Sequence, residues 1–338
     1  MLYKVENAKK FKETQRMKKR PIIILILLIL ISLPIFGGSV INKKKIIFCG
    51  VAKNIEKAIP ATVLSFQKLG SYFADYRVII YENNSIDNSS KLLDLWKKKN
   101  PKVTFISEIL KEHDLYTQSH GQTRKLHKPE LIARARNIVL DIAMQSQYED
   151  FDYILMADLD FLEPWDIEGI LSSFNFEEDW DAICANGIAS NGEHWDWYAF
   201  RDVRYPFGPE LYGPEWWSSL PEWRKNVCLH PDDPFLSVIS AFGGLAIYKR
   251  SSIKNCFYSG SVTPDLESLM STIINSKRIY QKNFLDNGRI KWLFDTHIGI
   301  TDSIIVCEHV TFHASMIKKG KEKIFVNPRM IMKYWQCL

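Results

Sequence analysis

The sequence predicts an α/β protein, built on a parallel sheet with helices on both faces and preceded by one membrane-spanning segment. Apolar strand-like runs alternate with helix-like stretches from Ile46 to about Asn186, a pattern typical of this class. The 338 residues are 46% hydrophobic and 13% aromatic, which is enough apolar material for a large core. Length alone permits one large domain or two smaller ones.

The N-terminus has the pattern of a signal anchor. Residues 1–20 carry eight lysines and arginines, and the uncharged run PIIILILLILISLPIF follows from Pro21 to Phe36. Residues up to 40 extend this run toward the roughly 20 residues that span a bilayer. Because more basic residues precede the run than follow it, the positive-inside rule predicts a cytoplasmic tail at 1–20 and an anchor at 21–40. A cleaved signal peptide and a buried core helix are the alternatives.

This orientation predicts a single-pass type II membrane protein, lumenal in the Golgi or endoplasmic reticulum of a eukaryote, or else at a bacterial inner membrane. Most of the net charge of +5 lies in the tail, and the rest of the chain is near neutral, which argues against nucleic acid as a partner. The cysteines lack C-x-x-C spacing, so a structural zinc site is not expected. Cys49 and Cys184 lie in apolar runs, whereas Cys228, Cys256 and Cys307 are better disulfide candidates.

The secondary structure is predicted from hydrophobic periodicity. Strands are expected at Ile46–Val51, Arg77–Tyr81, Val103–Ile106, Tyr153–Ala157 and Asp181–Ala185. Helices are expected at about Glu56–Leu69, Ser89–Lys99, Pro129–Gln147 and Asp166–Phe174. The Pro129 helix is the clearest, since proline occupies its first turn and apolar residues follow one stripe. After Asn186 the chain becomes aromatic and Pro-rich, which is typical of a substrate-facing insertion.

Two aspartates end the fourth predicted strand, in the run YILMADLDF. Asp158 and Asp160 are two positions apart, so strand alternation points both carboxylates to the same side. Carboxylate oxygens suit Mn²⁺ or Mg²⁺, and such an ion neutralises a departing nucleoside diphosphate. Asp-x-Asp is also common on solvated loops, so the position after an apolar strand carries this prediction.

Other polar residues adjoin this strand and its predicted neighbours. In VIIYENNSIDNSS, Glu82 is placed to accept bonds from a base or a ribose, and Asp87 to cap the next helix. A plain polar turn is the alternative. In LIARARN, Arg134 and Arg136 either face a diphosphate or pair with surface acids.

Together these segments resemble a known family. FCGVAKNIEKAIP, IIYENNSIDNSS, ARARN and YILMADLDF resemble the nucleotide-binding half of GT-A glycosyltransferases. WDAICANGI, WYAFRD, SAFGGLAIYKR, CEHVTFH and IFVNPR are similar to the fungal capsule-associated mannosyltransferase group and related viral and bacterial enzymes. The resemblance implies a GT-A, Rossmann-like mixed sheet flanked by helices over residues 42–338. It divides them into a nucleotide-sugar-binding half at 46–186 and an acceptor-binding half at 187–338.

The resemblance also implies function: a membrane-anchored, metal-dependent transfer of a sugar from a GDP- or UDP-sugar to a glycan or glycoconjugate, with mannose one candidate. The donor site that it implies consists of Val51, Ala52, Glu82, Asp87, Arg136, Asp158, Gly243 and Gly244. The implied ligands of Mn²⁺ or Mg²⁺ are Asp158, Asp160 and His313. An inverting enzyme also needs a general base, for which Asp233 and Glu308 are candidates; a retaining enzyme does not need one there.

Several alternatives remain open at this stage. A catalytically silent, membrane-anchored sugar- or nucleotide-binding protein is compatible with the same fold. Trp195, Trp197, Trp216 and Trp217 either stack on acceptor sugars or pack in the core. Glycosylation sequons at Asn83 and Asn88 fall in the predicted nucleotide loop, where a glycan would obstruct the site.

Overall fold

The computed structural model describes residues 41–119, 122–176, 178–213, 215–216, 227–293 and 304–334. The predicted cytoplasmic tail and signal anchor lie outside these ranges. Within them, no helix combines the length and the apolar character needed to cross a bilayer. Residues 41–338 form one compact unit, which is the part described below.

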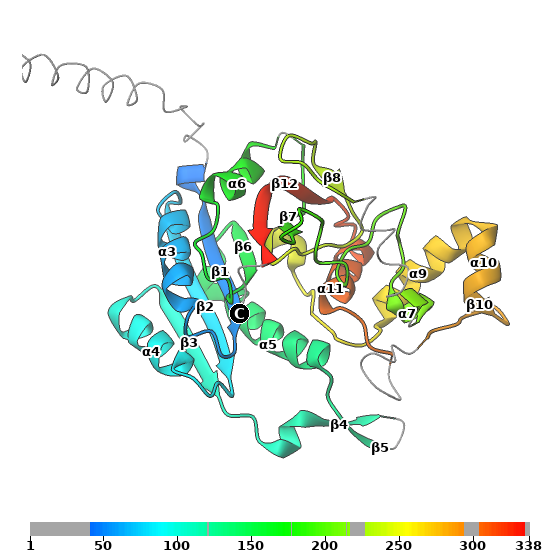
Figure 1. Ribbon diagram of the computed structural model, residues 1–338, viewed down its shortest axis with the longest axis horizontal. Helices are drawn as coiled ribbons and strands as arrows, with labels where there is room; N and C mark the ends of the chain where they lie inside the picture. The colour runs from blue at the N-terminus through cyan, green and yellow to red at the C-terminus, as the bar shows by residue number, and fades with distance from the viewer. Residues whose placement is uncertain are drawn as a thin grey trace, which may run out of the picture. The chain divides into compact units, whose positions relative to one another are not determined.

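The centre of this unit is a mixed sheet of eight strands in the order β3-β2-β1-β6-β9-β7-β12-β8 (Figure 1). The parallel half consists of β3 (Val103–Glu108), β2 (Asp75–Asn83), β1 (Lys45–Ala52) and β6 (Tyr153–Asp158). In the other half, β9 (Leu245–Lys249) runs antiparallel between β6 and β7 (Ala182–Ile188). The strand β12 (Ile324–Lys333) is parallel to β7, and β8 (Leu236–Ser237) pairs with it antiparallel. All five predicted strands are present, and the mixed sheet is confirmed.

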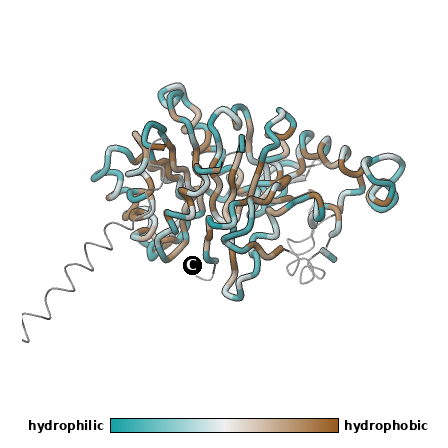
Figure 2. Tube along the Cα trace, turned by 90° about the horizontal axis from the view of Figure 1, so that it is seen from above, coloured by the Kyte–Doolittle hydropathy of each residue, from teal (hydrophilic) through white to brown (hydrophobic). Residues whose placement is uncertain are grey.

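Helices cover both faces of the sheet because alternate residues of each strand point to opposite sides. Ile46 and Phe48 of β1 pack in the core beneath α3 (Ile59–Gly70), α4 (Ser89–Lys99) and α6 (Ile167–Ser172). Ile47 and Cys49 pack in the other core, with α5 (Lys128–Ala143) and α11 (Glu308–Lys318). Figure 2 shows the apolar residues gathered along this central layer. Burial on both faces explains why the strands read as continuous apolar runs.

The remaining helices and strands are short or belong to the second half of the chain. The helices are α7 (Pro209–Tyr212), α9 (Pro264–Ser276) and α10 (Arg278–Phe284). The 3₁₀ turns are η1 (Ile41–Lys43), η2 (Glu112–Leu115), η3 (Ser146–Tyr148), η4 (Ser173–Asn175) and η5 (Arg250–Ile253). Two small hairpins pair β4 (Tyr116–Ser119) with β5 (Gln122–Lys125) and β10 (Leu285–Asp286) with β11 (Arg289–Ile290).

The first predicted helix begins later than expected, at Ile59 instead of Glu56. The intervening residues are bonded to the loop after β2. Asn54 has a φ of 56°, and its Oδ1 accepts from the backbone N of Ile86 at 2.8 Å. The backbone N of Glu56 in turn donates to Asp87 Oδ2 at 3.1 Å. The two loops therefore form one cross-linked rim at the end of β1 and β2.

The cysteines differ in part from the prediction. Cys49 and Cys184 are buried, as expected. In the described ranges every cysteine is a free thiol, including the three disulfide candidates Cys228, Cys256 and Cys307. The bridge prediction is therefore wrong for these three, and the burial of Cys256 and Cys307 shows that they act as small apolar side chains.

Candidate functional site

A cavity of about 470 Å³ opens where the parallel strands end. It lies between the ends of β1 and β6, the loops after β1 and β2, and the first turns of α5. Its lining residues are Val51, Ala52, Lys53, Asn54, Ile55, Asn83, Lys128, Leu131, Ile132, Ala135, Asp158, Leu159 and Asp160. The volume lies in the range of small-molecule sites, and the carboxyl edge of a parallel sheet is where such ligands bind. The predicted site residues Val51, Ala52, Asp158 and Asp160 all line it.

Two other predicted donor contacts do not reach the cavity. Glu82 is buried, and its carboxylate accepts from the backbone N of Ser85 at 2.8 Å and from Ser107 Oγ at 2.6 Å. Asp87 accepts from the backbone N of Glu56 and of Ser89. Both carboxylates form hydrogen bonds within the rim loops. The structure therefore gives them a positioning role instead of the predicted contact with the nucleotide.

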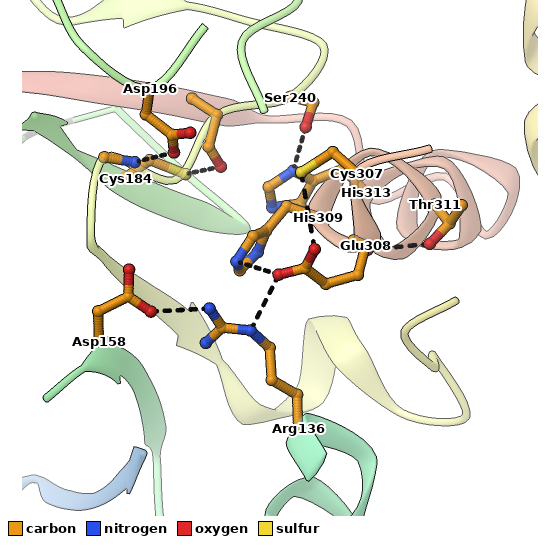
Figure 3. Close-up of polar contacts among 12 residues, drawn as sticks. Arg136, Asp158, Cys184, Asp196, Ser240, Cys307, Glu308, His309, Thr311 and His313 are labelled. Carbon is orange, nitrogen blue, oxygen red and sulfur yellow. Dashed lines mark hydrogen bonds and ion pairs between the residues drawn. The ribbon is translucent and has the colours of Figure 1, made fainter. Parts of the chain in front are cut away.

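Arg136 lies between Asp158 and Glu308 (Figure 3). Its side chain is only 3% exposed; Nη2 donates to Asp158 Oδ1 at 2.9 Å, and Nε donates to Glu308 Oε1 at 3.2 Å. The guanidinium carbon also lies 4.6 Å from the centre of the Phe242 ring. Burial alone lowers the pKa of Arg136, but the charges of Asp158 and Glu308 raise it well above its ordinary value. Arg136 therefore stays charged and holds Asp158, and it does not line the cavity as a direct donor contact.

The neighbouring Arg134 points elsewhere, because its guanidinium donates to Tyr81 Oη at 2.8 Å and to Glu108 at 2.9 Å. The alternative of pairing with an acid is thus the correct one for Arg134. For Arg136 the partners are also acids: the buried Glu308 and the partly exposed Asp158, which lines the cavity.

Asp158 and Asp160 bring two carboxylates to the cavity, with Lys128 in the same lining. Burial raises the pKa of Asp160 to about 6, and the charge of Asp158 adds to this, while Lys128 and Arg136 lower it. Such a pair fits a divalent cation of the Mg²⁺ or Mn²⁺ type, which takes one or two protein carboxylates and further oxygens from substrate phosphates.

The third predicted metal ligand, His313, is not in this place. It is fully buried on α11, where Nδ1 pairs with Ser240 Oγ at 2.9 Å and Nε2 with Tyr248 Oη at 3.2 Å. Burial lowers the pKa of His313 to about 3. The prediction is therefore wrong, because both ring nitrogens are used in the core. Among the described residues, no three His, Cys, Asp or Glu side chains are grouped so as to hold a metal ion.

The predicted glycine pair joins the two halves of the site. Gly243 and Gly244 have φ values of 64° and 91°, and a Cβ on Gly243 would lie 2.2 Å from the carbonyl oxygen of Ala185. The carbonyl of Gly244 accepts from the backbone N of Asp158 at 2.9 Å. The backbone N of Gly243 donates to Asp196 Oδ2 at 2.8 Å. The structure thus shows a tight entry to β9. Neither glycine lines the cavity, and their contact with the donor stays a prediction.

Asp196 is a residue that the sequence reasoning missed. Burial raises its pKa to about 6, opposed by the hydrogen bond from Gly243, while the charges of Asp158 and Glu308 raise it further. A carboxylate with a pKa near neutrality suits a general base. The available signal was the acid between two tryptophans in HWDWYAFRD.

The two predicted bases, like Asp196, are not among the residues that line the cavity. Glu308 begins α11, is buried, and is bonded to Arg136; burial raises its pKa. Asp233 lies in an exposed turn, where its carboxylate accepts from the backbone N of His230 at 2.7 Å. Neither side chain lines the cavity.

No protein-family model matches the chain, and neither does any curated protein. Solved structures do resemble it. Over 63% of this chain and 50% of the other, it is 15% identical to TarS 1–349 of S. aureus, with a TM-score of 0.33. Over 83% of this chain and 62% of the other, it is 13% identical to the mannosyltransferase PcManGT from Pyrobaculum calidifontis in complex with GDP-Man and Mn²⁺, with a TM-score of 0.34.

A third similar structure is glucosyl-3-phosphoglycerate synthase from Mycobacterium tuberculosis in complex with Mn²⁺, UDP and phosphoglyceric acid. It is 12% identical over 63% of this chain and 58% of that one, with a TM-score of 0.33. The matches thus span less than two thirds of these three solved chains. TarS 1–349 has also been solved in complex with UDP-GlcNAc, so each of the three is known with a nucleotide or a nucleotide sugar bound.

Proposed function

We propose that this chain is a membrane-anchored glycosyltransferase that moves a sugar from a GDP- or UDP-sugar to a glycan or glycoconjugate. The observation that carries the proposal is the cavity at the carboxyl edge of the sheet, where Asp158, Asp160 and Lys128 meet the loops after β1 and β2. The carboxylates and the lysine can bind a diphosphate and its metal ion, and the largely apolar remainder of the pocket can bind the nucleoside beside it.

In this proposal Asp158 and Asp160 hold Mn²⁺ or Mg²⁺, which neutralises the diphosphate when bound. Lys128 contributes a positive charge near the phosphates, and Val51, Ala52 and Asn83 contact the nucleoside. Arg136 acts as a positioning residue, because its bonds to Asp158 and Glu308 fix the orientation of the Asp158 carboxylate. Buried on α5, it has little freedom to move.

Asp196 is the proposed general base of an inverting reaction. The acceptor hydroxyl oxygen bonds to the anomeric carbon as the bond from that carbon to the diphosphate breaks, and the hydroxyl proton passes to Asp196. The hydrogen bond from the backbone of Gly243 orients Asp196, and the bond from Asp158 to Gly244 ties the same turn to the donor side. Mannose is one candidate for the transferred sugar, on the basis of the sequence resemblance.

The membrane anchor at 21–40 is part of the proposal and rests on the apolar run and the charge asymmetry. It places the catalytic domain on the side of the membrane opposite residues 1–20. Carbonate extraction of the full chain, with protease protection of a tag at each end, tests this arrangement. Release of the full chain by carbonate would contradict the anchor.

The decisive test of the activity is a donor screen on the full-length chain in detergent with Mn²⁺, which measures release of nucleoside diphosphate. Asp160→Asn is expected to reduce turnover at least about 100-fold, because it removes a charged ligand of the ion. Asp233→Asn, in its exposed turn, is the matched control and keeps wild-type turnover.

Three outcomes would contradict parts of this proposal. If no donor is consumed, the chain is not a glycosyltransferase of this class. If a nucleotide sugar binds but is neither hydrolysed nor transferred, the silent binding protein is the correct reading. If Asp160→Asn and a chelator both leave turnover unchanged, metal dependence is wrong.

A further inference from the structure

We propose that Trp195 and Tyr334 form an aromatic platform that binds a pyranose ring of the acceptor next to Asp196. The inference rests on the proposed function and extends it from the donor to the acceptor. It follows from the exposure of one tryptophan, the glycines beneath the tyrosine, and the connection of both to the donor side.

Trp195 differs from the other tryptophans of the aromatic segment. Its side chain is 47% exposed, whereas Trp197 and Trp216 are 3% and 1% exposed; Trp217 lies outside the described residues. A large aromatic surface left in contact with solvent, on a residue adjoining a candidate base, is typical of a ligand contact. The structure therefore distinguishes the members of this aromatic group: Trp197 and Trp216 pack in the core, and about half of Trp195 lies at the surface.

Tyr334 lies beside it, directly after β12. The ring centres of Trp195 and Tyr334 are 6.1 Å apart with planes inclined at 36°, and Phe161 meets Tyr334 edge-on at 5.6 Å. The phenol ring rests on glycines, because a Cβ on Gly187 would lie 2.7 Å from Tyr334 Cε2 and one on Gly244 would lie 3.4 Å from its Oη. Gly187 of β7, Gly244 in the turn before β9 and Phe161 after β6 thus surround the Tyr334 ring.

The platform is connected to both catalytic carboxylates. The backbone N of Trp195 donates to the carbonyl of Gly187 at 3.0 Å, and the next residue, Asp196, accepts from Gly243. Gly244 in turn accepts from the backbone N of Asp158. Trp195 therefore adjoins the proposed base along the chain, and Tyr334 contacts Phe161, which directly follows Asp160.

The chemistry of this surface selects a sugar. A pyranose presents a face of C–H groups that packs on an aromatic ring, and its hydroxyls project from the rim toward polar groups such as Asp196. The contacts described for this platform, aromatic rings and glycine backbone, match the apolar face of such a ring. The acceptor class is accordingly a neutral pyranoside at the end of a glycan or glycoconjugate.

The test uses the full-length chain in detergent with the donor found in the screen and with methyl α-mannoside, methyl β-glucoside and methyl β-galactoside as acceptors. Two rates are measured for each variant: donor hydrolysis without acceptor, and transfer as a function of acceptor concentration. Trp195→Ala is expected to raise the acceptor KM about tenfold or more while hydrolysis and the donor KM stay unchanged. Trp195→Phe retains a ring and is expected to restore most of the loss.

The matched control is Phe257→Ala, which removes an aromatic side chain of similar exposure, 48%, from the segment after η5. It is expected to change neither rate. An acceptor KM of Trp195→Ala within twofold of wild type, in an enzyme that transfers, would overturn the platform and leave the glycosyltransferase proposal intact.

A second measurement keeps the inference testable even without turnover. Saturation-transfer NMR with the same methyl pyranosides reports binding directly, and the signal is expected for wild type and Trp195→Phe but not for Trp195→Ala. A wild-type chain that binds none of the three sugars, or a Trp195→Ala variant that binds them equally well, contradicts the platform. Failure of donor turnover alone contradicts only the proposed function.

Discussion

The buried ion pair between Arg201 and Glu210 stabilises the segment that carries Trp195 and Asp196. Both side chains are fully buried, and Arg201 Nη2 donates to Glu210 Oε2 at 2.9 Å. Arg201 Nη1 also donates to the carbonyl of Phe200 at 2.8 Å, and Glu210 accepts from the backbone N of Gly208 at 2.9 Å. We expect Glu210→Gln, which keeps the shape of the side chain but removes its charge, to destabilise the protein strongly.

The magnitude follows from the burial of the pair. A fully buried guanidinium left without its counter-charge costs about 3–5 kcal/mol, a large part of a typical unfolding free energy of about 5–15 kcal/mol. At about 2 °C per kcal/mol for a domain of this size, the melting temperature is expected to fall by about 6–10 °C. In the double variant with Arg201→Met, no charge remains unpaired, so the loss should be smaller than the sum of the single losses by about 2–3 kcal/mol.

Urea unfolding and calorimetry at pH 7.5 on wild type, both single variants and the double variant give this cycle directly. Asp94→Asn is the control, since its partner Lys98 lies 2.6 Å away in an exposed pair one helical turn along α4. That control should cost at most about 0.5 kcal/mol. The reasoning is refuted if Glu210→Gln costs less than about 1 kcal/mol, or if the two single losses simply add.

Two further predictions concern the residues that join the halves of the site. Asp196→Asn should lower transfer about 10²–10⁴-fold, and wild-type transfer should fall as pH drops through about 6. The pKa of Asp196 in the folded protein is raised to about 6, so the unfolding free energy of wild type decreases as pH rises from about 4 to 6. Asp196→Asn lacks this titrating group. Its melting temperature should therefore exceed that of wild type at pH 7.5, and the difference should disappear toward pH 4. Gly243→Ala should cost roughly 2–5 kcal/mol, from positive φ and the contact with Ala185. Gly192→Ala, with a φ of 79° but open space around it, should cost only about 1–2 kcal/mol in the same urea titration.

The sequence predicted the parts of this protein that depend on local pattern. Burial on both faces makes β1 and β6 continuous apolar runs, and the cavity is lined by Asp158, the last residue of β6, and by Asp160, two residues further along. The helix boundary that was predicted wrongly depends on contacts between loops. The first helix begins at Ile59 because Asn54 and Glu56 are bonded to the loop after β2, and helical periodicity contains no information about that loop.

The site residues whose roles were predicted wrongly, or were missed, depend on contacts between segments distant in the sequence. His313 and Glu308 share α11, but five helical residues separate them by about 140° around the axis, so Glu308 meets Arg136 while His313 faces Ser240 and Tyr248. Asp196 and Tyr334 become site residues only because β9 inserts between β6 and β7 and because β12 pairs with β7. Neither pairing has a local signal in the sequence.

If the proposed sites are correct, the turn at Gly243 and Gly244 links the position of the donor carboxylate Asp158 to that of the proposed base Asp196. One glycine accepts from the backbone of Asp158 and the other donates to Asp196, so a displacement of this turn moves both carboxylates. Substitutions should therefore separate into two kinetic classes. Trp195→Ala affects only the acceptor KM, because its ring lies outside this connection. Gly243→Ala should depress donor hydrolysis and transfer together, and a variant of Gly243 that lost transfer while keeping full hydrolysis would show that the two carboxylates are positioned independently.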